Sequence, residues 1–342
     1  MSPLTVDALM LVSFGGPEKN EDVMPFLNNV LKGKPVSEER KKQVAEHYYL
    51  FDGKSPINEQ NLALIECIKR ELEKRKIDLP IYFANRNWQP YIHETIQKVV
   101  QDHRKKTLCM FTSAFSSYSG CRQYRNNLEQ AKADLEQSDN FEYEVLRKYY
   151  NHPKFIECIV ERFKEQENNH GISYKQADTK VLFTAHSIPM AMANSSDYVL
   201  QLEESCHLVA QFLGLENWEL VYQSRSGSPH IPWLEPDVCE RIGQLSQEDS
   251  RIKNLYVCPI GFISDHMEVI YDLDMEAKTI AAEQKINFIR VLTPGTHPIF
   301  VSMLVDLVEE VLYPQKNKKL AIGNYPAREV CPPNCCEWER RG

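Results

Sequence analysis

Short runs of hydrophobic residues alternate along the chain with longer segments in which hydrophobic residues recur every three or four positions. Short runs rich in β-branched and aromatic residues are typical of buried strands, and the periodic segments are typical of amphipathic helices. Eight runs predict strands, at 8–13, 79–84, 107–112, 143–146, 181–184, 220–222, 255–260 and 287–291. Six segments predict helices, at 58–76, 91–103, 152–167, 195–214, 265–283 and 296–312. The alternation indicates right-handed crossover connections and therefore parallel sheets.

Four predicted strands precede residue 170 and four follow it, so we expect two α/β domains, each a doubly wound parallel sheet of the Rossmann type. The polar segment Glu165–Thr179 has no apolar periodicity, which favours a boundary there. We expect four parts: an N-terminal domain over 1–170, a helical insertion within it over 20–52, a C-terminal domain over 171–315 and a Cys-rich extension over 316–342.

Composition and charge exclude several classes of protein. With 342 residues, 42% hydrophobic and 26% charged, the chain is typical of globular proteins. The net charge of -8 disfavours nucleic acid as a partner, because affinity for phosphates depends on clustered cations. No apolar run reaches the roughly 18 residues of a membrane-spanning helix, and the first run lacks the basic residues of a signal peptide. Ten cysteines in this context indicate reduced thiols or metal ligands, and we expect a cytoplasmic protein.

Candidate chemistry lies where the predicted strands end, because open parallel sheets bind ligands beyond the carboxyl ends of their strands. His186 follows one strand, and a neutral imidazole there can accept a proton or bind a divalent metal; a purely structural histidine is the alternative. An α-helix beginning near residue 265 would place four carboxylates within an arc of about 80°: Asp265, Glu268, Asp272 and Glu276. Such a row can pass protons or hold hard cations, whereas a solvated acidic face is the simpler alternative. No glycine pattern of a nucleotide-binding loop follows any strand.

Two of these segments resemble a known family. TAHSIP (184–189) and GFISDHMEVIYDLDMEA (261–277) are similar to the two signature segments of the ferrochelatases, which insert ferrous iron into a porphyrin. The resemblance continues in LMLVSFGGPE (9–18), GKSPINEQN (53–61), TSAFSSYSGCRQY (112–124), YQSRSGSPHIPWLEPDV (222–238) and TPGTHP (293–298). It implies a fold of the chelatase type, and more narrowly the bacterial branch whose substrate is coproporphyrin III.

The resemblance assigns roles to residues of the second half. It implies that His186 and Glu268 flank the macrocycle and bind the iron. A porphyrin loses two pyrrole protons as iron enters, so we expect His186 to act as the base, with Glu268, Asp272 and Glu276 as a proton relay. Ferrous iron accepts mixed imidazole and carboxylate ligands.

Contacts to the porphyrin are expected from the first half. Ser55 and Tyr124 match positions at which the family contacts the porphyrin, and Tyr48 in the insertion is a third expected wall, although an amphipathic helix explains Tyr48 equally well. Two positions depart from the family pattern. Phe14 stands where some coproporphyrin-type relatives have a tyrosine near the iron, and His47 precedes Tyr48 where some relatives have an arginine.

The C-terminal extension contains three cysteines within six residues: Cys331, Cys335 and Cys336. Zinc or a [2Fe–2S] cluster requires four ligands, so a fourth must come from elsewhere. Many ferrochelatases hold a [2Fe–2S] cluster with three C-terminal cysteines and one distant cysteine, and Cys158 matches the distant ligand. The spacing differs from the commoner one, so structural zinc and free thiols stay open as well.

We therefore expect an enzyme that inserts Fe²⁺ into coproporphyrin III, with a downstream enzyme of haem synthesis as a further partner. A second hypothesis keeps the chemistry but takes protoporphyrin IX. The Lys- and Glu-rich stretch 31–40 favours the more soluble tetracarboxylate, coproporphyrin III. Two hypotheses without catalysis also stay open: a carrier of tetrapyrrole or iron, and a two-domain protein that binds sugars or amino acids.

Overall fold

The computed structural model describes residues 6–33, 36–135, 140–226, 230–327, 331 and 334–338. Contacts divide the chain into two compact units. The first comprises Met1–Thr112, Gln123–Leu146 and Leu304–Lys318, and the second comprises Ser113–Arg122, Arg147–Met303 and Lys319–Gly342. None of the helices described is both long enough and apolar enough to cross a bilayer.

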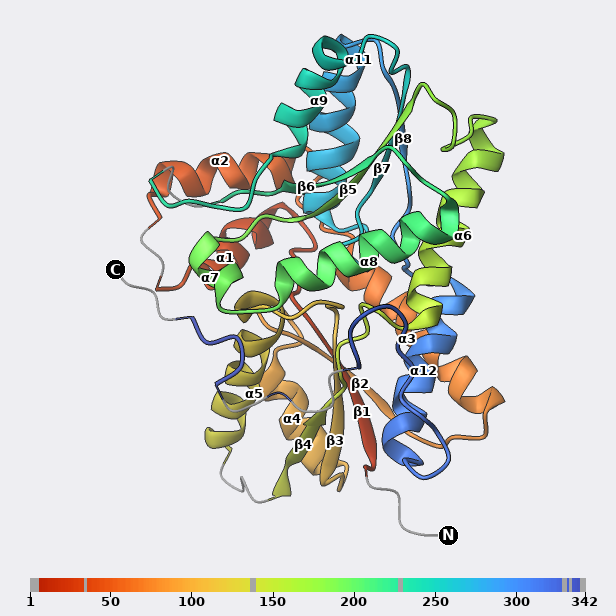
Figure 1. The fold of residues 1–342 in the computed structure, drawn as a ribbon. Coiled ribbons are helices and arrows are strands. Elements are labelled where there is room, and N and C mark those ends of the chain that lie inside the picture. The colour runs from red at the N-terminus through yellow and green to blue at the C-terminus, as the bar shows by residue number, and fades with distance from the viewer. Residues whose placement is uncertain are drawn as a thin grey trace. The chain divides into compact units, whose positions relative to one another are not determined.

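The first unit contains a parallel four-stranded sheet in the order β2-β1-β3-β4 (Figure 1). Its strands are β1 (Ala8–Ser13), β2 (Ile81–Asn85), β3 (Lys106–Phe111) and β4 (Glu142–Val145). Its helices are α1 (Asn20–Val30), α2 (Glu38–Tyr49), α3 (Ile57–Lys74), α4 (Ile92–Gln101) and α5 (Gln123–Ala133). Every residue of the central strand β1 is buried, which explains its continuous apolar sequence.

The second unit contains a parallel sheet in the order β6-β5-β7-β8. Its strands are β5 (Thr179–His186), β6 (Trp218–Gln223), β7 (Asn254–Cys258) and β8 (Asn287–Arg290). Its α-helices are α6 (Pro153–His170), α7 (Met190–Asn194), α8 (Tyr198–Leu213), α9 (Val238–Glu248), α10 (Met267–Val269) and α11 (Lys278–Glu283). Two π-helices, η1 (Tyr118–Arg122) and η3 (Ile270–Ala277), complete it, and α12 (Pro298–Leu312) begins in this unit and ends in the first.

These elements confirm the predicted fold class, because each of the eight predicted strands is present and both sheets are parallel. The boundary between the two units does not lie at a single position of the sequence, however. Helix α6 belongs by its contacts to the second unit, although we expected residues 1–170 to form one domain, and α12 contributes to both units. Whether 1–170 and 171–315 would fold as separate domains stays a prediction.

Helices cover both faces of the second sheet. In β5 the buried Leu182 belongs to the cluster formed with α9 and α11, whereas the ring of the next residue, Phe183, lies 6.0 Å from that of Phe163 in α6. Successive side chains of a strand point to opposite faces, so α6 packs on the face opposite α9 and α11. Figure 1 shows α9 and α11 side by side along this sheet.

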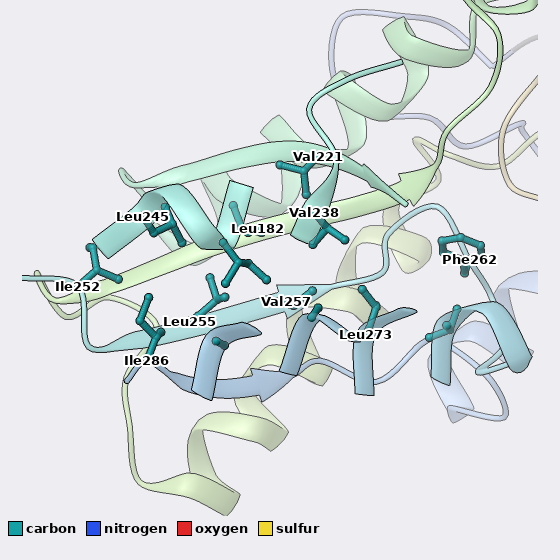
Figure 2. Packing of buried hydrophobic residues seen from close by; sticks show 14 residues of the cluster. Leu182, Val221, Val238, Leu245, Ile252, Leu255, Val257, Phe262, Leu273 and Ile286 are labelled. Atoms are coloured by element: carbon teal, nitrogen blue, oxygen red, sulfur yellow. The ribbon is translucent and has the colours of Figure 1, made fainter. Parts of the chain in front are cut away.

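The packing between the sheet and η3 fixes the segment that carries the predicted carboxylates. Val269, Leu273 and Ala277 are fully buried in the hydrophobic cluster, and Figure 2 shows Leu273 pointing into it beside Val257. These residues are spaced four apart, and each directly follows Glu268, Asp272 or Glu276. Burial of the three apolar side chains in the core therefore fixes the direction of the three carboxylates that precede them.

The predicted helical insertion is present as α1 and α2, which pack against each other. As expected for an N-cap, the Ser37 hydroxyl accepts a hydrogen bond from the Arg40 backbone N–H at 3.2 Å. The buried face contains Phe26, against which Tyr48 packs edge-on at 5.8 Å between ring centroids. Tyr48 thus belongs to the packing of the insertion.

Candidate active site

His186 and Glu268 come together at the carboxyl end of the second sheet. His186 is the last residue of β5, Glu268 lies in α10 after the neighbouring strand β7, and their Nε2 and Oε2 atoms are 3.7 Å apart. His186 Nδ1 lies 2.5 Å from the Ser187 carbonyl oxygen. A carbonyl only accepts hydrogen bonds, so Nδ1 carries the proton, and in the neutral ring the Nε2 lone pair is directed toward Glu268.

The main chain around His186 is fixed by several hydrogen bonds. The Tyr198 hydroxyl donates to the His186 carbonyl at 3.0 Å, and the Ser187 N–H donates to the Gln223 carbonyl at 2.8 Å. The turn after β7 passes so close that a Cβ at Gly261 would lie 2.7 Å from the Ala185 Cα. Only glycine allows this approach, which brings the segment carrying Glu268 beside β5.

His266 orients the start of the helical segment that carries Glu268. Its Nδ1 accepts a hydrogen bond from the Glu268 N–H at 3.2 Å, so the histidine acts as the N-cap of α10. Burial lowers the pKa of His266, which keeps the imidazole neutral and its Nδ1 lone pair available. The Phe262 ring packs edge-on against it, with centroids 5.2 Å apart. The sequence reasoning assigned His266 no role, although its position two residues before Glu268 is that of a cap.

Asp272 is the most strongly perturbed carboxyl group of the row. The pKa of Asp272 is raised to about 7, chiefly by burial and also by the charges of Glu268 and Glu276, while hydrogen bonds from Ser224 and Gln223 oppose the shift. The Ser224 hydroxyl donates to Asp272 Oδ2, and Gln223 Nε2 donates to the same oxygen at 3.3 Å. Asp272 can therefore gain and lose a proton near neutral pH.

The end of β6 and the residue after it, far from η3 in the sequence, hold Asp272 in place. Ser224 adopts a φ of 63°, a left-handed conformation that is uncommon for a residue other than glycine. Gln223 also accepts a hydrogen bond from the Thr184 hydroxyl at 2.8 Å, which links β5 to the carboxylate row through β6. The sequence reasoning missed both Gln223 and Ser224, because nothing local indicates that they reach η3.

Glu276 completes the row, and Asp265 does not belong to it. Burial raises the pKa of Glu276, and the negative charge of Asp237 raises it further. Our expectation that Asp265 shares the face of the other three carboxylates is wrong. Asp265 precedes α10 and binds the Arg290 guanidinium at 2.5 Å, as does Asp274 from η3.

The segment 265–283, predicted as one α-helix, is also not a continuous α-helix. It begins at Met267 and contains the π-helix η3 between α10 and α11. A π-helix has i→i+5 hydrogen bonds and a wider turn than an α-helix, so the 100° step used for the sequence does not hold there. The wider turn keeps residues spaced four apart closer to one line.

The expected porphyrin contacts belong to the first unit. Ser55 is buried after α2, and its N–H donates to the Pro17 carbonyl at 2.9 Å. Tyr124 is buried with its ring 5.0 Å from that of Phe111. Arg86, which the sequence reasoning missed, directly follows β2 and lies over the Tyr124 ring at 4.6 Å. A complete survey of the predicted strand ends would have included it.

The Lys54 ammonium lies 2.8 Å from the carboxylate of Glu59, and both side chains are well exposed. The pair forms at the start of α3, whose first residue is Ile57.

The cysteines of the expected cluster are not assembled as a ligand set. Cys335 and Cys336 have their sulfur atoms 3.4 Å apart. Within the described parts of the chain, which include Cys158 and Cys331, no three His, Cys, Asp or Glu side chains form a group able to hold a metal. Cys158 is buried in α6, and burial raises its pKa to about 12, as for a neutral thiol. The described residues therefore show no assembled four-thiolate site.

Comparison with known proteins adds an independent line of evidence. The model of the family described as Ferrochelatase matches residues 6–312. A protein named Ferrochelatase from Rhodopirellula baltica is 49% identical over 98% of this chain and 94% of its own length. A protein named Coproporphyrin III ferrochelatase from Streptomyces coelicolor is 41% identical over 96% of this chain and 93% of its own length.

Among solved structures, SirB from Bacillus subtilis with Fe3+ is similar with a TM-score of 0.57 at 12% identity. The alignment covers 91% of this chain and 98% of that one. At this identity the similarity concerns the fold alone, and it agrees with two parallel-sheet units.

Proposed function

The chain belongs to the ferrochelatase family, and we propose that it inserts ferrous iron into coproporphyrin III to give iron-coproporphyrin III. The His186–Glu268 pair carries this proposal, because it places a lone pair of an imidazole 3.7 Å from a carboxylate oxygen at the carboxyl end of the sheet. Relatives named Coproporphyrin III ferrochelatase support the choice of porphyrin.

The reaction replaces two pyrrole N–H protons of the porphyrin with Fe²⁺ and therefore releases two protons. In our proposal the His186 Nε2 lone pair and the Glu268 carboxylate first bind Fe²⁺, and the same lone pair accepts a pyrrole proton only after the iron has passed to the porphyrin nitrogens. Asp272 and Glu276 then take protons away along η3. The pKa of about 7 at Asp272 supports this role, because a relay works best when its pKa is close to the ambient pH.

Turnover is expected to rise with pH through about 7, because Asp272 accepts a proton only when ionised. Asp272→Asn should remove that rise and lower kcat about 10- to 100-fold, since an amide carries no proton between groups. A profile of kcat against pH measures both effects. If the Asn variant keeps the wild-type profile, Asp272 is not part of the relay.

The same substitution should stabilise the fold at high pH. The folded-state pKa of Asp272 is above the usual 3.8, so its contribution to stability is greatest at low pH and is lost as pH rises through about 7. Relative to wild type, Asp272→Asn should therefore gain stability from about pH 4 to about pH 7, by at most about 1.4 kcal/mol per pH unit, and little more above that. Glu283→Gln is the matched control, because Glu283 is exposed at the end of α11. This substitution should change neither the pH profile of kcat nor the stability of the fold.

The choice of porphyrin is tested by turnover of coproporphyrin III and protoporphyrin IX under the same conditions. Coproporphyrin III carries four carboxylates and protoporphyrin IX two, so a site adapted to the former should give kcat/KM at least about tenfold higher, through charge-assisted hydrogen bonds. Equal or faster insertion into protoporphyrin IX would overturn this part of the proposal. Porphyrin binding by wild-type protein without any insertion would favour a carrier instead.

A [2Fe–2S] cluster at Cys158, Cys331, Cys335 and Cys336 stays a prediction from the sequence. The 3.4 Å separation of the Cys335 and Cys336 sulfurs supports the binding of one cluster by both cysteines. Among the described residues, the buried Cys158 forms no metal-binding group with them. Anaerobically purified protein should show the visible absorption of a [2Fe–2S] chromophore if the cluster exists. Cys335→Ser should then abolish the absorption, and Cys109→Ser, in the core strand β3, should keep it. A colourless wild-type protein with no bound iron would refute the cluster.

We also propose the cytoplasm as the site of the reaction and an enzyme of haem synthesis as the acceptor of the product. The chemistry supports an acceptor, because iron-coproporphyrin III still carries the propionates that haem formation would modify.

A further inference from the structure

Arg290 connects the framework of the second sheet to both ends of the segment that bears Glu268 and Asp272. It is the last residue of β8, and its side chain is only 14% exposed. One guanidinium nitrogen lies 2.5 Å from Asp265, before α10, and another lies 2.5 Å from Asp274, within η3. The arginine thus spans the segment from outside the proposed site.

The two ion pairs of Arg290 divide the carboxylates of the segment into those that the arginine binds and those that it leaves. Five carboxylates occur between residues 265 and 276, and Arg290 binds two of them, Asp265 and Asp274. The remaining three are Glu268, Asp272 and Glu276. Without the arginine, Asp265 and Asp274 would add two unpaired negative charges to the segment that bears this set.

We propose that Arg290 is a positioning residue for iron insertion, which fixes the separation and direction of Glu268 and Asp272 by holding Asp265 and Asp274 with one guanidinium. The inference rests on the proposed function and extends it to a residue outside the two signature segments. A guanidinium is planar and presents its donors in a fixed fork, so both carboxylates are held at a defined distance from β8. The bond to Asp274 also holds the wide turn of η3, whose other side is fixed by Leu273 in the core.

Lysine at this position separates geometry from charge. An ammonium group keeps the positive charge but lacks the planar fork that holds two carboxylates in fixed directions. If Arg290 acts by geometry, Arg290→Lys should lower kcat about as much as Arg290→Met does. If it acts only by neutralising charge, Arg290→Lys should keep the wild-type kcat.

Arg241 provides the matched control. Its side chain is 13% exposed, and it pairs with two carboxylates of the same unit, Glu219 and Glu248, neither of which belongs to the row. Arg241→Met should therefore remove a comparable pair of ion pairs and a comparable part of the folding stability. It should leave kcat within about two-fold of wild type, because it touches none of the row.

The experiment measures kcat, the KM for coproporphyrin III, the KM for Fe²⁺ and thermal unfolding for wild type and the three variants. We expect both Arg290 variants to lose about 10- to 100-fold in kcat and to raise the KM for Fe²⁺, with the KM for the porphyrin changed less than about two-fold. Wild-type kcat in Arg290→Lys would overturn the inference. So would an equal loss of kcat in Arg241→Met at equal loss of stability.

These outcomes are distinct from failure of the proposed function itself. If wild-type protein inserts no iron into either porphyrin, the proposed function fails. If wild type is active and Arg290→Lys is equally active, only the role of Arg290 fails. Should Arg290→Met not fold, Arg290→Lys and Arg241→Met still decide the question, because the lysine variant retains the buried charge.

Discussion

Replacing His186 with alanine is expected to abolish iron insertion, with kcat lowered about 10²- to 10⁴-fold, the usual range for removing a general base. The reason is the arrangement of the ring: Nδ1 is committed to the Ser187 carbonyl, so Nε2 is the atom that faces Glu268 and would meet a pyrrole proton. Binding of coproporphyrin III, followed by its Soret absorption, should persist, because the expected porphyrin contacts belong to the first unit.

His297→Ala is the matched control for this experiment. His297 Nε2 also lies 3.7 Å from a glutamate oxygen, that of Glu165, but it sits beside the start of α12 and not at the end of β5. This variant should keep kcat within about two-fold of wild type. A His186→Ala protein that inserts iron within about tenfold of the wild-type rate would exclude His186 as the base.

Glu268→Gln is expected to have the second-largest effect, with kcat lowered about 10²-fold or more and a higher KM for Fe²⁺. Glutamine keeps the shape of the side chain and the backbone N–H that donates a hydrogen bond to His266. Its neutral amide is a weaker ligand for a cation than a carboxylate and accepts no proton. Removing the charge should also lower the pKa of Asp272, because Glu268 contributes to raising it. The rise of activity with pH should then begin at lower pH.

Two comparisons make the Glu268 experiment decisive. Glu268→Asp keeps the charge on a shorter side chain and should retain more activity than Glu268→Gln if the charge binds Fe²⁺. Glu283→Gln removes an exposed carboxylate of the same helical segment and should leave activity unchanged. An active Glu268→Gln protein with an unchanged KM for Fe²⁺ would show that this carboxylate neither binds the metal nor moves protons.

The strands were predictable because burial on both faces makes a parallel strand continuously apolar. Every residue of β1 is buried, and its sequence is apolar up to Ser13, while seven of the eight residues of β5 are buried around the apolar run Val181–Phe183. The rule that ligands bind at strand ends then directed attention to His186 and to the segment after β7. The division into two units was less predictable, since α12 contributes to both through contacts that no local pattern records.

The sequence by itself determined the parallel α/β fold, the family and the residues that carry the candidate chemistry, because each depends on local apolar patterns or on motifs within short segments. Tertiary structure alone decided which partners those residues contact. Ser224 reaches Asp272 from 48 positions away, and Arg290 takes Asp265 out of the row that helical geometry had assigned to it. Burial, which raises the pKa of Asp272 to about 7, is likewise a property of the packed molecule. These hydrogen bonds, ion pairs and burial arise between segments that are distant in the sequence, and the pattern of residues along the chain does not give the distances between such segments.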